Sequence, residues 1–240
     1  MSVLRLPSCV TSVERRTISG NFVPAQRELI LRHALTCGAD FVAMIDDDMV
    51  LPPDALQRLC DAILADPTVA LVGALYYSRD GLRPMAVANW DPGRTTSANT
   101  PGFDGTTPVT VDGVGFGCVL VRASALRDLP QPFLRTHVYI EEVAGRVRVC
   151  DEDYLFCETL RAAGHHVLLH SGVRCGHFDR SSERTFPERW EEASVTRGPR
   201  MMIRRPDGTP ALVAADSSLG EAGERHVPAS IEYIYPTEHR

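Results

Sequence analysis

The first part of the chain alternates between helical and strand-like patterns of apolar residues. Residues 25–35 have the spacing of a helix, with a proline at its first turn and a glycine after its end. The unbroken apolar run at 41–45 predicts a strand that is covered on both faces. A second helix is expected after Pro52-Pro53-Asp54, and a second apolar strand at 69–77. The apolar face of that second helix is formed by Leu56, Leu59, Cys60, Ile63 and Leu64. The order helix, strand, helix, strand indicates a parallel sheet with crossover connections.

The pattern continues after a long irregular stretch. Residues 89–108 are rich in Thr, Gly, Pro and Asn and lack periodicity, and a loop this long inside a compact domain is usually functional or mobile. Further elements are expected as a strand at 118–121, a short helix at 123–129, a helix at 150–163 and a strand at 166–170. The fold class that follows is α/β, an open sheet flanked by helices.

The patterning weakens after residue 180. We assign residues 1–180 to one α/β domain and residues 181–240 to a C-terminal extension. In the extension, residues 188–192 have the composition of a short helix. Residues 201–205 and 211–214, joined by a Pro-Asp-Gly-Thr turn, predict a hairpin.

The composition says little about the fold, but it excludes several classes of function. The 240 residues carry a net charge of −6, which argues against a broad nucleic-acid footprint. No apolar run approaches the ~20 residues of a membrane span, and the N-terminus lacks the apolar core of a signal peptide. The seven cysteines are scattered and odd in number, so we expect reduced, mostly buried thiols and a cytoplasmic protein. Composition leaves a homo-oligomer open.

The sequence contains no lysine, so all 25 basic side chains are arginine. This excludes Schiff-base chemistry, the lysine of a phosphate-binding P-loop and the lysine of protein kinases. A bound phosphate would therefore have to be held by a metal, by arginine or by backbone N–H groups.

Three carboxylates, Asp46-Asp47-Asp48, directly follow the apolar run at 41–45. The carboxyl end of a strand is where open α/β sheets bind their ligands. Adjacent carboxylates repel one another unless a cation lies nearby. Since hard divalent metals prefer oxygen ligands, the pattern predicts a site for such a metal.

Four pieces of sequence, taken in this order, resemble the GT-A glycosyltransferases, in particular the large inverting, nucleotide-sugar-dependent family 2. They are Ala25-Gln26-Arg27-Glu28, Ile45-Asp46-Asp47-Asp48, Glu152-Asp153 with the helix end Arg161-Ala162-Ala163-Gly164-His165, and Val173-Arg174-Cys175-Gly176-His177. The resemblance implies a Rossmann-like GT-A fold with an open, mixed and mostly parallel sheet. It also implies a metal-dependent enzyme that transfers a sugar with inversion.

The resemblance assigns roles to the acids and the late histidine. Asp48 and His177 would bind the divalent metal, Mn²⁺ or Mg²⁺, and Asp46 would contact the metal or the donor's ribose. Asp153 would be the general base, with Glu152 beside it. Because Asp153 begins a helix, the helix dipole is expected to lower its pKa slightly, while desolvation by a bound acceptor would raise it.

The remaining assignments concern the substrates. Arg27 and Asp47 would contact the nucleotide of a nucleoside diphosphate sugar, with uridine as the expected nucleoside. The acceptor would be a carbohydrate or another hydroxyl compound. The glycine run at 113–117 precedes a strand rather than a helix, so a dinucleotide site is not expected. We expect instead a turn at which donor or acceptor approaches the backbone, with Asp112 as a sugar contact.

One departure from the family and two rival functions stay open. The usual opening strand, which holds the nucleobase in the family, is missing or reduced to residues 3–7. A haloacid-dehalogenase-like phosphohydrolase would use Asp46 as its nucleophile, but those enzymes usually also need a lysine. The third alternative is a domain that binds a nucleotide sugar without turnover.

Overall fold

The computed structural model divides the chain into two compact units, Met1–Val195 and Thr196–Arg240. The residues that it describes are 4–20, 22–81, 83–90, 101–141, 146–188, 190, 200–204 and 210–214. In the second unit, strand β13 (Arg200–Arg204) pairs antiparallel with β14 (Pro210–Ala214). Residues 91–100 of the irregular stretch, and most of the helix predicted at 188–192, lie outside the described residues. The division of the chain at residue 180 stays a prediction.

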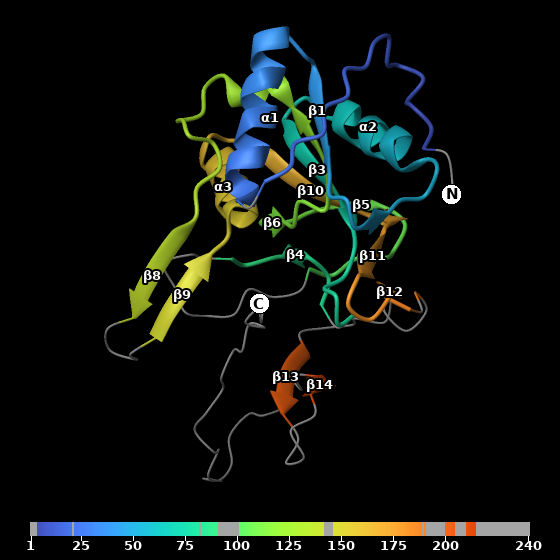
Figure 1. Ribbon diagram of the computed structural model, residues 1–240, viewed down its shortest axis with the longest axis vertical. Helices are drawn as coiled ribbons and strands as arrows, with labels where there is room; N and C mark the ends of the chain where they lie inside the picture. Colours follow the sequence, from blue (N-terminus) through green and yellow to red (C-terminus); the bar gives the residue numbers. More distant parts are fainter. Residues whose placement is uncertain are drawn as a thin grey trace. The chain divides into compact units, whose positions relative to one another are not determined.

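A five-stranded sheet forms the centre of the first unit (Figure 1). In spatial order its strands are β1 (Phe41–Ile45), β7 (Cys118–Arg122), β3 (Val69–Leu75), β10 (His166–Arg174) and β5 (Pro108–Thr110). Strands β1, β3 and β10 run in one direction, and β7 and β5 run in the other. The predicted α/β class with an open mixed sheet is confirmed. The predicted crossover from β1 to β3 also forms, but β7 lies between β1 and β3 in the sheet.

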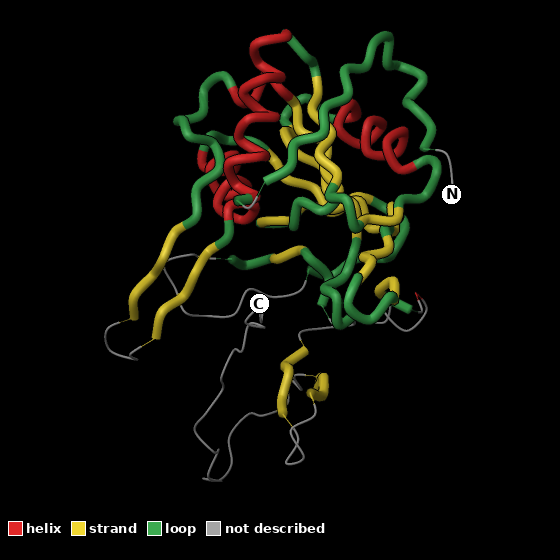
Figure 2. Tube along the Cα trace, viewed as in Figure 1, coloured by secondary structure: helices red, strands yellow, loops and turns green. Residues whose placement is uncertain are grey.

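Helices cover both faces of this sheet (Figure 2). The helices are α1 (Val23–Cys37), α2 (Ala55–Ala65), the 3-10 helix η1 (Ala123–Leu126) and α3 (Glu152–Ala162). Buried residues of α1, η1 and α3 share one apolar cluster, whereas those of α2 belong to a second cluster. All seven residues of β3 are buried, as expected for a strand between two layers of helices. Within the described ranges, none of the helices has the length and apolar character needed to cross a membrane.

Helices α1 and α2 form where they are predicted, but the third predicted helix begins at Glu152 rather than at residue 150, and the short helix predicted at 123–129 ends at Leu126. The prediction that the strand at 41–45 is covered on both faces is wrong, since Ala43 is exposed and Ile45 is 40% exposed. One position in the predicted apolar face of α2 is also wrong. Helix α1 has a proline in its first turn and ends at Gly38, whose φ of 71° is in the left-handed region. In α2 the buried stripe ends at Ile63, and Leu64 in the last turn is 49% exposed. Residues 4–20 form neither helix nor strand, so the described part of the reduced opening strand does not form.

Small sheets and hairpins extend from the carboxyl ends of the central strands. One has the order β12 (Arg184–Phe186), β11 (Gly176–Asp179) and β2 (Met49–Val50). The others pair β4 (Ala86–Val87) with β6 (Gly113–Val114), and β8 (His137–Glu141) with β9 (Arg146–Cys150). The seven cysteines are free thiols; four of them are buried, but Cys9 and Cys37 are exposed.

Candidate active site

Strand pairing brings the late histidine to the acidic end of β1. The chain leaves β1 through Asp46-Asp47-Asp48 and enters β2, and β11 pairs antiparallel with β2 so that His177 is opposite Met49. The N–H of Phe178 donates to the carbonyl of Asp48 at 2.8 Å. As a result, His177 Nε2 lies 3.2 Å from Asp48 Oδ2, although 129 residues separate them in the sequence.

The hydrogen bond at Nδ1 of His177 determines whether Nε2 of the neutral ring carries a hydrogen or a free lone pair. Nδ1 lies 2.8 Å from the carbonyl oxygen of Tyr77, and because a carbonyl only accepts, Nδ1 carries a proton. When the ring is protonated, Nε2 also carries a hydrogen and donates it to Asp48 Oδ2; when the ring is neutral, the Nε2 lone pair is available to a cation bound between the two groups. A histidine held in this way by a backbone carbonyl is suited to metal binding through Nε2.

The two groups change each other's pKa. The hydrogen bond from His177, with a second one from Arg79, holds the pKa of Asp48 at about 2 in spite of partial burial. Burial lowers the pKa of His177, but the hydrogen bonds with Asp48 and the Tyr77 carbonyl raise it by more, so the pKa lies above its ordinary value. Asp48 is thus ionised at neutral pH and available to a cation.

Two arginines that the sequence patterns did not single out lie over these acids. Arg79 Nη2 is 2.6 Å from Asp48 Oδ2, and Arg180 Nη2 is 2.6 Å from Asp47 Oδ2. The side chains of Arg79 and Arg180 are 58% and 71% exposed, and that of Asp47 is 85% exposed. No short motif marks them, because one follows β3 and the other follows β11.

A more buried cluster centres on Arg27, close to the start of α1. Its Nη2 donates to both carboxylate oxygens of Asp46, at 2.9 and 2.7 Å, and its Nη1 donates to Glu152 Oε1 at 2.7 Å. The side chains of Arg27 and Glu152 are only 11% and 10% exposed. The guanidinium also lies over the ring of Phe116. One arginine therefore joins the end of β1 to the first turn of α3, and it does so with its planar, forked donor group.

Asp153 is buried beside this cluster, in the first turn of α3. Burial, and then the neighbouring charge of Glu152, raise its pKa to about 7, although the N–H of Tyr154 and the charge of Arg27 act in the opposite direction. The expectation that the helix start lowers this pKa is wrong, because desolvation outweighs the helix dipole. A carboxyl group of this pKa can take up or release a proton near neutral pH.

Tyr76 lies between the two clusters and is buried. Its ring packs edge-on against His177, with 5.4 Å between the ring centroids. Its hydroxyl accepts the N–H of Gly117 at 3.1 Å, and burial and the charge of Asp153 raise its pKa. A Cβ at Gly115 or Gly117 would collide with the Tyr76 ring or hydroxyl. Tyr76 therefore occupies the Cβ side of these two glycines, and the approach of a ligand to this turn stays a prediction.

Asp112 lies at the start of β6, and both of its carboxylate oxygens have partners. Oδ2 accepts the backbone N–H of Trp90 at 2.9 Å, and Oδ1 lies 2.7 Å from Arg161 Nη2. The carboxylate thus ties the start of the irregular stretch to α3. A sugar contact by Asp112 stays a prediction.

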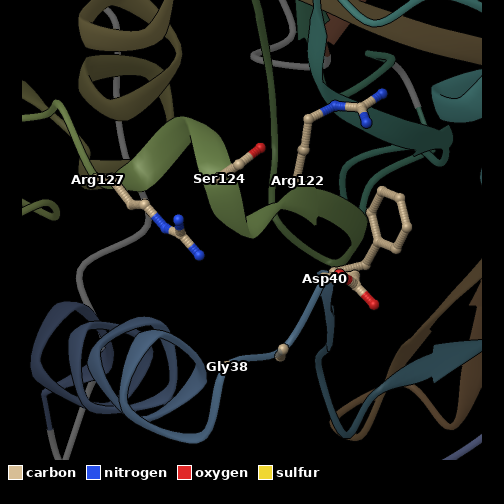
Figure 3. Close-up of a pocket in the computed structure, with 7 residues that line it drawn as sticks. Gly38, Asp40, Arg122, Ser124 and Arg127 are labelled. Carbon is tan, nitrogen blue, oxygen red and sulfur yellow. The ribbon is translucent and has the colours of Figure 1, made fainter.

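A hollow lined by Gly38, Ala39, Asp40, Phe41, Arg122, Ser124 and Arg127 lies at the opposite, amino end of β1 (Figure 3). The guanidinium of Arg122 donates to backbone carbonyls at the end of α2 and the start of β3. Arg122 therefore acts as a cap for α2, and this hollow is separate from the acidic end of the sheet.

Comparison with known proteins identifies the first half of the domain. Residues 24–129 match the family described as "Glycosyl transferase family 2". Among solved structures, the chain is similar to A197 from STIV, with a TM-score of 0.49 and 18% identity over 86% of this chain and 83% of that chain. No curated protein matches. The family match includes Arg27, Asp46, Asp48 and Asp112, whereas Glu152, Asp153 and His177 follow it and reach the site through the tertiary structure.

Proposed function

We propose that this glycosyltransferase, whose residues 24–129 match glycosyl transferase family 2, transfers a sugar from a nucleoside diphosphate sugar to an acceptor hydroxyl. The proposed donor is UDP-linked, the transfer proceeds with inversion, and a divalent metal assists it. Enzymes of this family generally use nucleotide-sugar donors and often use divalent metals. The supporting observation is that Asp48 and His177 meet at 3.2 Å, and that Tyr76, whose ring packs against His177, also lies near the buried carboxyl group of Asp153, which has a pKa of about 7.

The proposed metal ligands are Asp48 and His177. The residues fit such an ion, because Asp48 is an ionised carboxylate and His177 is held with Nε2 toward it. A carboxylate together with an imidazole favours Mn²⁺ over Mg²⁺, which prefers oxygen ligands alone. When bound, the cation would neutralise charge on the diphosphate.

Asp46 and Arg27 are proposed to face the nucleotide. Both oxygens of Asp46 accept from Arg27, so its carboxylate is already oriented before a donor binds. We assign Asp46 to the donor's ribose, with the metal as its alternative partner. Asp47, Arg79 and Arg180 lie at the exposed edge of the site, and the two guanidinium groups would contact phosphate oxygens in a chain without lysine.

Asp153 is the proposed general base. Its carboxylate would take the proton of the acceptor hydroxyl while the acceptor oxygen forms a bond to the anomeric carbon. The bond from that carbon to the diphosphate oxygen breaks, and its electron pair leaves with the diphosphate. Glu152, fixed by Arg27, would keep the first turn of α3 in place and add the negative charge that raises the pKa of Asp153. The burial of Asp153 favours proton uptake near neutral pH.

A paired binding and transfer assay tests this function. Thermal shift and isothermal titration with UDP, GDP, ADP and CDP, each with Mn²⁺, with Mg²⁺ or without metal, would identify the nucleoside and the cation. Radiolabelled sugar donors would then report donor hydrolysis and transfer. We expect metal-dependent stabilisation by one nucleoside diphosphate and release of that nucleotide from its sugar conjugate. Binding without any turnover would favour the domain that only binds nucleotide sugars.

The phosphohydrolase alternative gives a different product. It would release inorganic phosphate from a simple phosphoester such as p-nitrophenyl phosphate and would lose this activity in Asp46→Asn. Asp46 is paired through both oxygens with Arg27, which makes it a poor nucleophile in this state. Phosphate release without any donor hydrolysis would overturn the proposed sugar transfer.

A further inference from the structure

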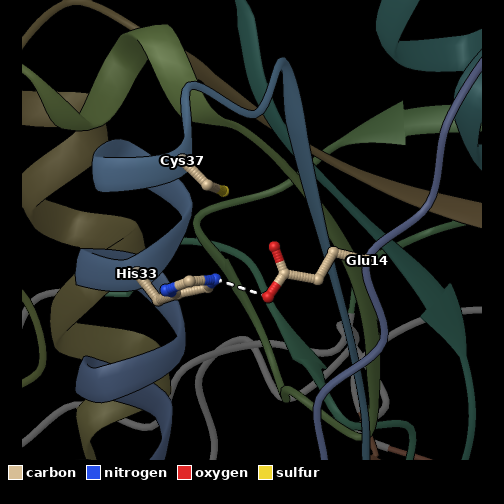
Figure 4. Close-up of side chains that lie close together, drawn as sticks. All are labelled: Glu14, His33 and Cys37. Carbon is tan, nitrogen blue, oxygen red and sulfur yellow. Dashed lines mark hydrogen bonds and ion pairs between the residues drawn. The ribbon is translucent and has the colours of Figure 1, made fainter.

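A second group of potential metal ligands lies between α1 and the N-terminal segment (residues 4–20). The segment has no helix or strand. Its backbone is tied to the region of α2 by two hydrogen bonds, from Arg5 N–H to Pro53 O and from Ser8 N–H to Gln57 Oε1. Further along, Glu14 reaches α1 and meets His33 and Cys37 (Figure 4).

The helix geometry explains why these three side chains converge. His33 and Cys37 are four residues apart on α1, so they lie on the same face one turn from each other. Glu14 enters from the N-terminal segment, and its Oε1 lies 2.8 Å from His33 Nε2. The carboxylate oxygen, the ring nitrogen and the Cys37 sulfur all lie within 4.8 Å of one another. Figure 4 shows the three side chains directed into one space between the segment and the helix.

We propose that Glu14, His33 and Cys37 bind a zinc-like divalent transition metal that fastens the N-terminal segment to α1. One oxygen, one imidazole nitrogen and one thiolate form a borderline to soft donor set, which favours Zn²⁺ and Co²⁺ and disfavours Mg²⁺. Three protein ligands leave a fourth position for water in a tetrahedral site. This inference is independent of the proposed sugar transfer, since none of the three residues belongs to that site.

The local hydrogen bonds are compatible with metal binding. Arg16 Nε and His33 Nε2 both lie 2.8 Å from Glu14 Oε1, so this side chain is already held toward the ring of His33. The Cys37 thiol donates only a long, 3.5 Å hydrogen bond to Ala34 O. A bound cation would take the place of the Cys37 thiol proton and of the hydrogen between His33 and Glu14. Metal binding would therefore release protons.

The first test is cobalt spectroscopy on the full chain. Co²⁺ bound to Cys37 gives a thiolate-to-cobalt charge-transfer band and the visible bands of a tetrahedral ion. We expect both in the wild type, loss of the charge-transfer band in Cys37→Ser, and at least about tenfold weaker Zn²⁺ binding in His33→Ala and Glu14→Gln. Cys150→Ser and Cys9→Ser are matched controls, because these thiols lie outside the cluster.

A second measurement, limited proteolysis, tests whether the metal holds the N-terminal segment on α1. Trypsin cleaves after Arg15 and Arg16 in the segment, and Zn²⁺ should slow this cleavage in the wild type but not in Cys37→Ser. The variant Asp48→Ala should keep the cobalt band and the protection, which separates this proposal from the proposed active site. A cobalt spectrum without a thiolate band, an unchanged spectrum in Cys37→Ser, or equal cleavage with and without Zn²⁺ would overturn the inference.

Discussion

The two halves of the acidic site differ in how they balance charge. In the inner half, Arg27 bridges Asp46 and Glu152 and is only 11% exposed, and Asp153 beside it is buried and has a pKa of about 7. In the outer half, Asp48 pairs with His177 and with the exposed Arg79, and the neighbouring Asp47 pairs with the exposed Arg180. Buried ion pairs hold their geometry because breaking them is costly, whereas exposed pairs contribute little and exchange easily.

This difference suggests a division of work between the halves. The inner half is arranged before any ligand binds. Its positive charge is that of Arg27, whose guanidinium is held by three hydrogen bonds. The outer half holds an ionised carboxylate and an orientable imidazole, and its arginines can turn toward another anion. Variants that break one half should therefore affect chemistry and stability, and variants of the other half should affect metal and donor binding.

The largest expected effect is that of Asp153→Asn in the inner half. Loss of the proposed base should lower kcat by roughly 10²- to 10⁴-fold while leaving donor affinity nearly unchanged. Single-turnover transfer measured beside isothermal titration separates the two quantities. The matched control is Asp128→Asn, an exposed carboxylate after η1. Full activity in Asp153→Asn would disprove the base assignment.

Arg27→Ala should be the most destabilising single change in this cluster. It leaves Glu152 and the 41% exposed Asp46 unpaired, and breaking the buried pair with Glu152 costs about 3 kcal/mol of unfolding free energy. Arg27→Lys should recover only part of this loss, because an ammonium group lacks the fork that binds both carboxylates. Urea unfolding measures both variants. Arg184→Ala, which breaks an exposed pair with Glu188, serves as the control and should change stability little.

The stability of the wild type relative to Asp153→Asn should depend on pH. Because the folded pKa of Asp153 is raised from 3.8 to about 7, the protonated group contributes fully below pH 3.8. That contribution is lost as pH rises through about 7. Between about pH 5 and pH 8 the wild type should therefore lose roughly 2 to 3 kcal/mol relative to the variant. Urea unfolding of both proteins at the two pH values measures this loss, and equal pH dependence would contradict a buried, proton-binding Asp153. Activity should rise over the same range, because the base must be ionised.

His177→Ala tests the outer half. Removal of one proposed ligand should weaken Mn²⁺ binding by at least about tenfold, with little change in unfolding free energy. His166→Ala, an exposed histidine at the amino end of β10, is the matched control. Isothermal titration with Mn²⁺ in the presence of the nucleoside diphosphate gives the affinities. Identical metal binding in both variants would remove His177 from the proposed metal site.

Arg79→Ala should have the smallest effect on stability, below about 1 kcal/mol, because the Arg79 side chain is 58% exposed and Asp48 keeps His177 as its partner. Donor affinity should fall modestly and should depend less on salt than in the wild type. Titration at two ionic strengths measures this difference. A loss of stability as large as that of Arg27→Ala would mean that the two halves do not differ as described.

The sequence by itself determined the first two helices, most of the central strands and the chemical character of the site. Gly38 ends α1 and the all-apolar residues 69–75 form a central strand, because both features depend on neighbours along the chain. The acids at the end of β1 and the resemblance to family 2 were also readable locally, and the family match confirms that resemblance.

Only the tertiary structure decided which groups meet and how they titrate. The pairing of β2 with β11 brings His177 to Asp48, and Arg27 reaches Glu152 across 125 residues of sequence. Sheet order and burial are set by contacts between distant segments, which no local pattern specifies. For the same reason, the pKa of Asp153 could not be read from its place at a helix start, since desolvation by the packed core exceeds the effect of the helix.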